Sequence, residues 1–140
     1  MYGAILGDIA GSRFEFSRPA GFDPQKEQLF ANACFYTDDT VMTVATKYAV
    51  LRSIPYARAG YGTMFKQWLD GHCERGYNSF GNGAAMRVSF IGQYFDTMEK
   101  VWEEAEKSAE CTHNHPDGIR AAVATAAVIF LARSGASKKE

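Results

Sequence analysis

Two carboxylates and two hydroxyls stand together in Thr37-Asp38-Asp39-Thr40, directly before an apolar, helix-like run that starts at Val41. At a helix N-terminus these oxygens lie close together, whereas a strand or a mid-helix position would spread them apart. Hard cations such as Mg²⁺, Mn²⁺ and Ca²⁺ prefer oxygen ligands, so the segment predicts part of a metal site. The alternative is an ordinary helix cap, because Thr and Asp are favoured N-caps and the helix dipole stabilises acids in a first turn.

A second candidate is the glycine-rich loop from Ser79 to Gly83. Gly81 and Gly83 remove side-chain bulk, so that backbone N–H groups at the start of the next helix can approach an anion such as a phosphate. Taken alone, the same letters indicate a turn in most proteins.

The elements that must position these loops are helices. Periodicity, caps and breakers predict helices over Tyr2–Gly11, Asp39–Arg52, Pro55 to Leu69, Ala84–Tyr94, Met98–Glu110 and Ile119–Ala132. Ser17 to Phe35 is broken by prolines and glycine and is expected to be a loop. No segment alternates as a strand does, so the predicted fold class is all-α, with the chemistry in loops that precede helices.

Two of these helices carry more detailed expectations. Asp96 or Thr97 should cap the helix over Met98–Glu110, with Val101, Trp102 and Ala105 facing inward. The run Ile119–Ala132 is expected to be a buried helix, because it is strongly apolar but shorter than the roughly 20 residues that a membrane span needs.

Composition limits the class of partner. The chain has 140 residues, of which 46% are hydrophobic and 14% aromatic, enough for one globular domain with a core over 1–140. Fifteen basic and sixteen acidic residues are well mixed and leave a formal net charge of −1. No electrostatic pattern favours nucleic acid or a membrane surface, and a small partner is expected.

Cysteine usage predicts a reducing cytoplasm. Cys34, Cys73 and Cys111 are odd in number and widely spaced, which argues against both a disulfide framework and a zinc knuckle. No signal peptide is expected, because the chain starts without a basic leader and Asp8 interrupts the first apolar stretch.

Four polar or glycine-rich segments follow one another along the chain: Gly7-Asp8-Ile9-Ala10-Gly11-Ser12-Arg13-Phe14-Glu15, Tyr36-Thr37-Asp38-Asp39-Thr40, Ser79-Phe80-Gly81-Asn82-Gly83-Ala84-Ala85-Met86-Arg87 and Thr112-His113-Asn114-His115-Pro116-Asp117-Gly118. In this order and spacing the chain resembles the ADP-ribosylglycohydrolase family, the type that includes dinitrogenase-reductase-activating glycohydrolase and ADP-ribosyl-acceptor hydrolases. The resemblance covers Tyr2 to about Phe130. It implies a compact all-α domain similar to the N-terminal half of that family's fold.

The resemblance also implies a dinuclear Mg²⁺ or Mn²⁺ centre that serves release of ADP-ribose from a modified protein side chain. The family's T-D-D triplet matches Thr37, Asp38 and Asp39 as metal ligands, and an upstream glutamate matches Glu15. Glu15 and Asp38 are the implied catalytic residues. A third carboxylate would help to hold cations and orient a water, whereas the alternative for Glu15 is a surface acid.

Contacts to ADP-ribose are implied for the loop residues and for one histidine. The family's equivalent loops contact the diphosphate and ribose, which carries this role to Ser79, Gly81, Asn82 and Gly83. Phe80 and Tyr77 are candidates for stacking on adenine, and the alternative for both is a place in the core. The family's H-x-x-H-P-like element lines the ribose and phosphate site, so the resemblance implies His115 in preference to His113; Pro116 also restricts the backbone of His115. A structural hydrogen bond is the alternative for either histidine.

The chain departs from the family by lacking the second acidic motif, of the D-x-D-T type, that completes the metal centre. Its own ligands would suffice for one ion or for none, because Mg²⁺ gives up its waters reluctantly. The expected function is metal-dependent hydrolysis of the ADP-ribose glycosidic bond, with ligands from a second copy or a complementing C-terminal polypeptide. The alternatives are an inactive ADP-ribose-binding module and an N-terminal remnant.

Overall fold

The computed structural model describes residues 1–58 and 81–138 of the chain. Helices make up its regular structure there, and these ranges contain no strand, which confirms the all-α prediction. The elements are α1 (Tyr2–Gly11), η1 (Ser12–Phe14), α2 (Asp38–Arg52), η2 (Tyr56–Arg58), η3 (Asn82–Ala84), α4 (Ser89–Tyr94), α5 (Met98–Glu110) and α6 (Pro116–Arg133), where η marks a short 3-10 helix.

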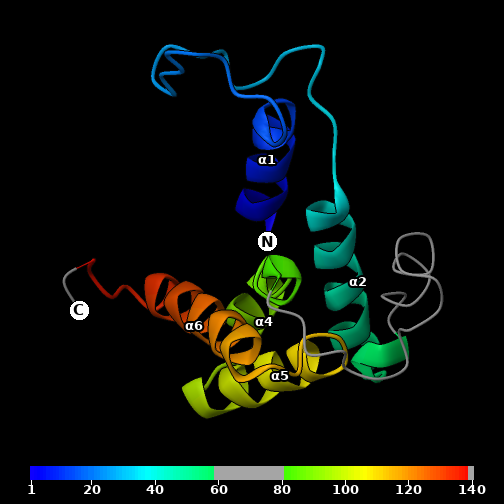
Figure 1. The fold of residues 1–140 in the computed structure, drawn as a ribbon. Coiled ribbons are helices and arrows are strands. Elements are labelled where there is room, and N and C mark those ends of the chain that lie inside the picture. Colours follow the sequence, from blue (N-terminus) through cyan, green and yellow to red (C-terminus); the bar gives the residue numbers. More distant parts are fainter. Residues whose placement is uncertain (59–80, 139–140) are drawn as a thin grey trace.

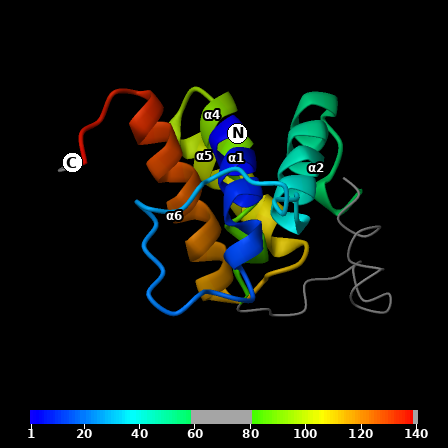
Figure 2. The same ribbon diagram turned by 90° about the horizontal axis from the view of Figure 1, so that it is seen from above.

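Helices α1 and α2 pack against each other and run in opposite directions, joined by the long connection that was predicted as a loop (Figure 1). The N-terminus of α1 lies against α4, because the ammonium group of Met1 donates a hydrogen bond to Gln93 Oε1. Viewed from above, α1 lies between α2 and α6 (Figure 2). This arrangement brings the end of α1 next to the beginning of α2.

The core lies where α2, α4, α5 and α6 meet. Small residues at a four-residue spacing on α6, Gly118, Ala122 and Ala126, are fully buried and let its neighbours approach closely. At Gly92 of α4 an added Cβ would lie 2.4 Å from the Ala126 carbonyl oxygen, so only glycine fits this crossing. The fold is therefore specified at α6 by small residues rather than by large apolar ones.

Three expectations for these helices need correction. The helix predicted over Ala84–Tyr94 begins only at Ser89, because the preceding residues form η3 and turns held by the buried side chain of Arg87. Trp102 is 54% exposed, since the buried face of α5 passes through Val101 and Ala105 instead. Helix α6 is buried on one face only, and Val128 is 64% exposed.

Thr97, one of the two expected caps, is the N-cap of α5 and accepts a hydrogen bond from the Lys100 amide. The predicted helix from Pro55 to Leu69 lies mostly outside the described residues. Within the described part of this range, the helical element is the short η2. None of the described helices combines the length and the hydrophobicity that crossing a bilayer would require.

Candidate functional site

Thr37 is the N-cap of α2, and the two acids follow it in the first turn. Its extended backbone (φ −112°, ψ −166°) starts the helix, and its hydroxyl accepts a hydrogen bond from the Asp39 amide at 3.3 Å. Asp38 and Asp39 lie at the positive end of the helix dipole, which stabilises their charges. The helix-cap interpretation of this segment is confirmed, and the Thr37 hydroxyl also contacts Asp39 Oδ2 at 3.5 Å.

Asp8 on α1 reaches across to the same helix end. Its carboxylate accepts four hydrogen bonds: from Thr37 Oγ1 at 2.6 Å, the Thr37 amide at 2.9 Å, Thr40 Oγ1 at 2.5 Å and the Thr40 amide at 3.2 Å. Burial by itself would raise the pKa of Asp8, but the hydrogen bonds from Thr37 and Thr40 outweigh it and lower the pKa. Asp8 is thus an ionised acid fully engaged by α2.

An open cavity of about 380 Å³ lies where α1, η1, α2 and η3 meet. Its lining brings together residues from three of the four segments singled out in the sequence: Asp8, Glu15, Thr37, Asp39 and Asn82. Asp38 is exposed and is not among the lining residues. The tertiary structure therefore places Glu15, Thr37, Asp39 and Asn82, all candidates from the sequence, around one cavity.

The acids around this cavity act on one another. Burial, and then the negative charges of Asp38, Asp8 and Glu15, raise the pKa of Asp39 above its ordinary value. This is the electrostatic effect expected of carboxylates that lie close to one another. A positive charge in the cavity would relieve it.

The donor set suits a hard cation, although it is small. Carboxylate and hydroxyl oxygens from Glu15, Thr37 and Asp39 are the ligand type that Mg²⁺ and Mn²⁺ take. Within residues 1–58 and 81–138, no three His, Cys, Asp or Glu side chains are clustered closely enough to hold a metal ion. The residues thus fit the chemistry of such an ion but supply only part of its coordination sphere.

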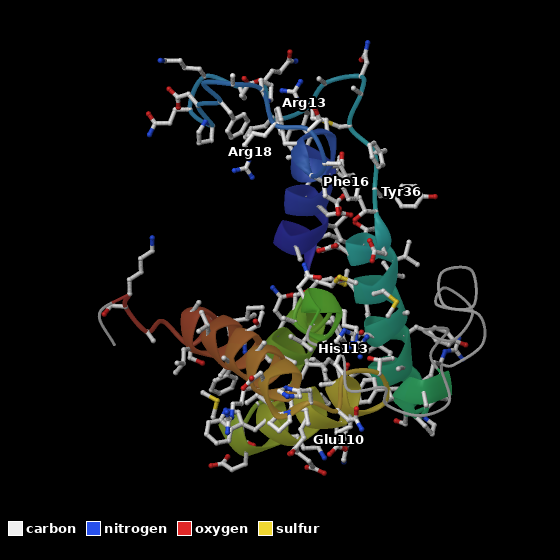
Figure 3. All side chains as sticks on the ribbon, in the orientation of Figure 1. Arg13, Phe16, Arg18, Tyr36, Glu110 and His113 are labelled. Carbon is white, nitrogen blue, oxygen red and sulfur yellow. The ribbon has the colours of Figure 1, made fainter. Side chains whose placement is uncertain are left out.

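The loop at Gly81–Gly83 packs against His113. An added Cβ on Gly83 would lie 2.9 Å from His113 Cε1, so the loop comes within van der Waals distance of the imidazole ring. His113 lies in the interior, near the C-terminal end of α5 (Figure 3), and its Nδ1 is 2.8 Å from Thr112 Oγ1. Burial, assisted by the charge of Arg87, lowers the pKa of His113 to about 4, so the ring is neutral at physiological pH.

Arg87 connects this loop to the end of α5. Its fully buried guanidinium donates to the Ser108 carbonyl oxygen and, at 2.8 Å, to Thr112 Oγ1. The same Thr112 hydroxyl contacts His113. The hydrogen bonds of Arg87 therefore attach the segment after Gly83 to the C-terminal end of α5.

His115 lies at the beginning of α6 as its N-cap. Its Nδ1 accepts a hydrogen bond from the Asp117 amide at 3.2 Å, and Pro116 occupies the first helical position. It is not among the residues that line the acidic cavity. Ser79, Phe80 and Tyr77 lie outside the described residues.

Sequence reasoning assigned no role to Asp8 and gave His113 only the alternative of a structural hydrogen bond, although these two residues contact the predicted loops. A signal for Asp8 was present: a charged side chain inside an otherwise apolar, small-residue helix must have a partner or face solvent. For His113 the only local signal was its position in a polar turn after α5. What each residue contacts depends on segments distant in the sequence.

Comparison with known proteins agrees with the resemblance seen in the sequence. The family model described as ADP-ribosylglycohydrolase matches residues 1–140. The curated ADP-ribosylhydrolase ARH3 of Homo sapiens and that of Mus musculus are each 28% identical over the whole chain, and the Gallus gallus protein is 27% identical. The chain spans about half the length of these relatives. No solved structure gives a significant match.

Proposed function

The chain belongs to the ADP-ribosylglycohydrolase family, and from this we propose that it serves metal-dependent hydrolysis of the glycosidic bond between ADP-ribose and a modified protein side chain. The observation that carries the proposal is the cavity lined by Glu15, Thr37, Asp39 and Asn82, because it joins an oxygen-rich acidic group to the glycine-rich loop. An all-oxygen donor set is suited to Mg²⁺ or Mn²⁺.

In this proposal Thr37, Asp38, Asp39 and Glu15 would hold the cation, which when bound would supply Lewis-acid polarisation of the ribose and a place for the water. Glu15 and Asp38 act as catalytic carboxylates, one of which takes a proton from the water as the water oxygen attacks the anomeric carbon. The bond from that carbon to the protein side chain breaks as the new C–O bond forms, and the released side chain takes up a proton, so that one water is added across the broken bond.

The diphosphate and ribose are proposed to lie over the glycine-rich loop. Asn82 lines the acidic cavity and offers an amide for hydrogen bonds, and Gly81 exposes its backbone beside it. Gly83 rests on the neutral ring of His113, which keeps the loop rigid. Ser79, Phe80 and His115 complete the proposed contacts.

We propose that the metal centre is completed by a second polypeptide, either another copy of this chain or a complementing C-terminal polypeptide. The chain spans about half the length of its curated relatives, and within the part of the chain that the structure describes the donors fall short of the roughly six oxygens that these cations take. A cytoplasmic location is proposed with it, because three cysteines, odd in number and widely spaced, argue against a disulfide framework.

The decisive measurement is release of ADP-ribose from peptides modified on arginine or serine, with Mg²⁺ or Mn²⁺ present and with EDTA as the control. We expect metal-dependent release of ADP-ribose, and we expect Asn82→Ala to reduce it tenfold or more. The variant loses a hydrogen bond to the charged diphosphate, and a hydrogen bond to a charged group is worth about 1.5–3 kcal/mol. Asn32→Ala, an exposed asparagine away from this cavity, should leave release unchanged.

The same protein samples distinguish the proposed hydrolase from two alternatives. An inactive ADP-ribose-binding module would show no release, but calorimetry would detect ADP-ribose binding that Asn82→Ala removes. An N-terminal remnant would show neither release nor binding. These alternatives are favoured by the small set of donor groups around the cavity within residues 1–58 and 81–138.

A further inference from the structure

We propose that Asp8 is a positioning residue for the acidic site, by which we mean the proposed metal ligands Glu15, Thr37, Asp38 and Asp39. Its carboxylate fixes the first turn of α2 and so sets where Asp38 and Asp39 present their own carboxylates. The inference rests on the proposed function for what the site does, but the role of Asp8 can be tested without any activity. It begins from the four hydrogen bonds that join α1 to α2.

The pattern of these bonds is that of a capping box completed by another helix. In a capping box, the side chain three residues after the N-cap, Glu or Gln, accepts a hydrogen bond from the N-cap amide. Here that position is Thr40, which has no carboxylate. Asp8 takes over the role from α1, because it accepts from the amide of the N-cap Thr37 and also from the amide of Thr40.

Thr37 at the start of the turn and Thr40 at its end are thereby both attached to the carboxylate of Asp8. Asp8 Oδ1 accepts from the Thr37 hydroxyl, while Oδ2 accepts from both amides and from the Thr40 hydroxyl. Asp38 and Asp39 are the two residues between these attachment points. Since their backbone is fixed on either side, their carboxylates leave the helix from a defined place.

The same bonds leave Asp8 little capacity for direct metal ligation. Each carboxylate oxygen has about two lone-pair sites; three donors crowd Oδ2, and the Thr37 hydroxyl takes one of the two sites on Oδ1. Asp8 therefore acts through Thr37 and Thr40. Asparagine is not an equivalent replacement, because its amide nitrogen cannot accept a hydrogen bond.

The test is NMR of the full chain, following the amide protons of Thr37 and Thr40 in Asp8→Asn, Thr40→Val and Thr40→Ser. We expect Asp8→Asn to move both amide signals upfield and to lower their protection from hydrogen exchange by about fivefold or more, as for a broken local network. Thr40→Ser keeps the hydroxyl and should resemble the unmodified chain, whereas Thr40→Val should not.

The matched control removes a different cap. Thr97→Val deletes the N-cap hydroxyl of α5, a helix that begins far along the chain from the acidic site. It should lower overall stability while leaving the Thr37 and Thr40 amide signals in place. The proposal is overturned if Asp8→Asn leaves these signals and their protection unchanged, or if Thr97→Val disturbs them equally. Should Asp8→Asn fail to fold, the Thr40 pair decides the matter with Asp8 intact.

Addition of Mn²⁺ to the same samples separates this inference from the proposed function. If the acidic site binds the ion, Mn²⁺ should broaden the Asp38 and Asp39 signals, and Asp8→Asn should raise the half-saturating concentration by about 10- to 100-fold, as found for residues that orient metal ligands. Absence of broadening in the unmodified chain would count against the metal site alone, and the Thr37 and Thr40 amides would still test Asp8.

Discussion

His113 is a buried polar residue whose protonation the fold opposes. Its side chain is 2% exposed, and burial together with the charge of Arg87 lowers its pKa to about 4. In an unfolded chain the pKa of a histidine is about 6.5. Between these two values the unfolded state binds more protons than the folded state, so acid shifts the equilibrium toward unfolding.

Stability should consequently fall as the pH drops from 6.5 toward 4, and should not depend on His113 above about pH 7. The expected loss between pH 7.5 and 5 is on the order of 2 kcal/mol, measured as the change in free energy of unfolding in urea. His113→Gln should remove this part of the pH dependence, while His115→Gln should retain it. An unchanged pH dependence in His113→Gln would refute the assignment.

Among the contacts between elements, the glycine-rich loop packs closely against the turn after α5. The position of a Cβ on Gly83 falls 2.9 Å from His113 Cε1 and 3.0 Å from Nε2, and the ring is held in place by Thr112. An alanine there must displace either the loop or the ring.

Gly83→Ala should therefore destabilise the chain by about 1–3 kcal/mol, the usual cost of overpacking, and should weaken ADP-ribose binding. Removing the opposing ring in the double variant Gly83→Ala, His113→Ala should recover part of the loss caused by Gly83→Ala. Thermal unfolding measures the stability of the single and the double variant. Gly3→Ala is the control, because nothing lies within 4 Å of that Cβ position and no loss is expected.

At the scale of the whole molecule, much apolar surface stays exposed. No residue of α1 is fully buried, and Tyr2 and Leu6 are 74% and 52% exposed. On α2, Tyr48 and Leu51 are each 52% exposed. Exposed apolar side chains that gather into a patch normally meet another surface, and the exposure of these residues supports the proposed second copy or complementing polypeptide.

We expect a homo-oligomer at micromolar concentration when the chain is alone. Tyr48→Lys should shift analytical-ultracentrifugation profiles toward the monomer, since it places a charge on the exposed face of α2. Glu106→Gln, on the exposed face of α5, should leave the profile unchanged. A strictly monomeric profile for the unmodified chain would contradict the expectation of self-association.

The helices were largely predictable because their signals are local. A cap, a period of apolar residues and a breaker lie within a few turns, which gave α1, α2 and α5 nearly at their observed bounds. Trp102 was misassigned because a helical period does not say which of two adjacent apolar positions faces the core. The late start of α4 depends on the burial of Arg87, a contact with residues more than twenty positions away.

Local spacing and the order of motifs were enough to predict the all-α class, the family and the helix end at which Thr37, Asp38 and Asp39 gather. That Glu15 and Asn82 share a cavity with Asp39, that Asp8 completes the cap of α2, and that Gly83 packs on His113 became visible in the three-dimensional fold alone. Hydrogen bonds and close packing join side chains by distance in space, and Thr37 stands 29 positions after Asp8, a separation along the chain that does not encode how far apart the two side chains are.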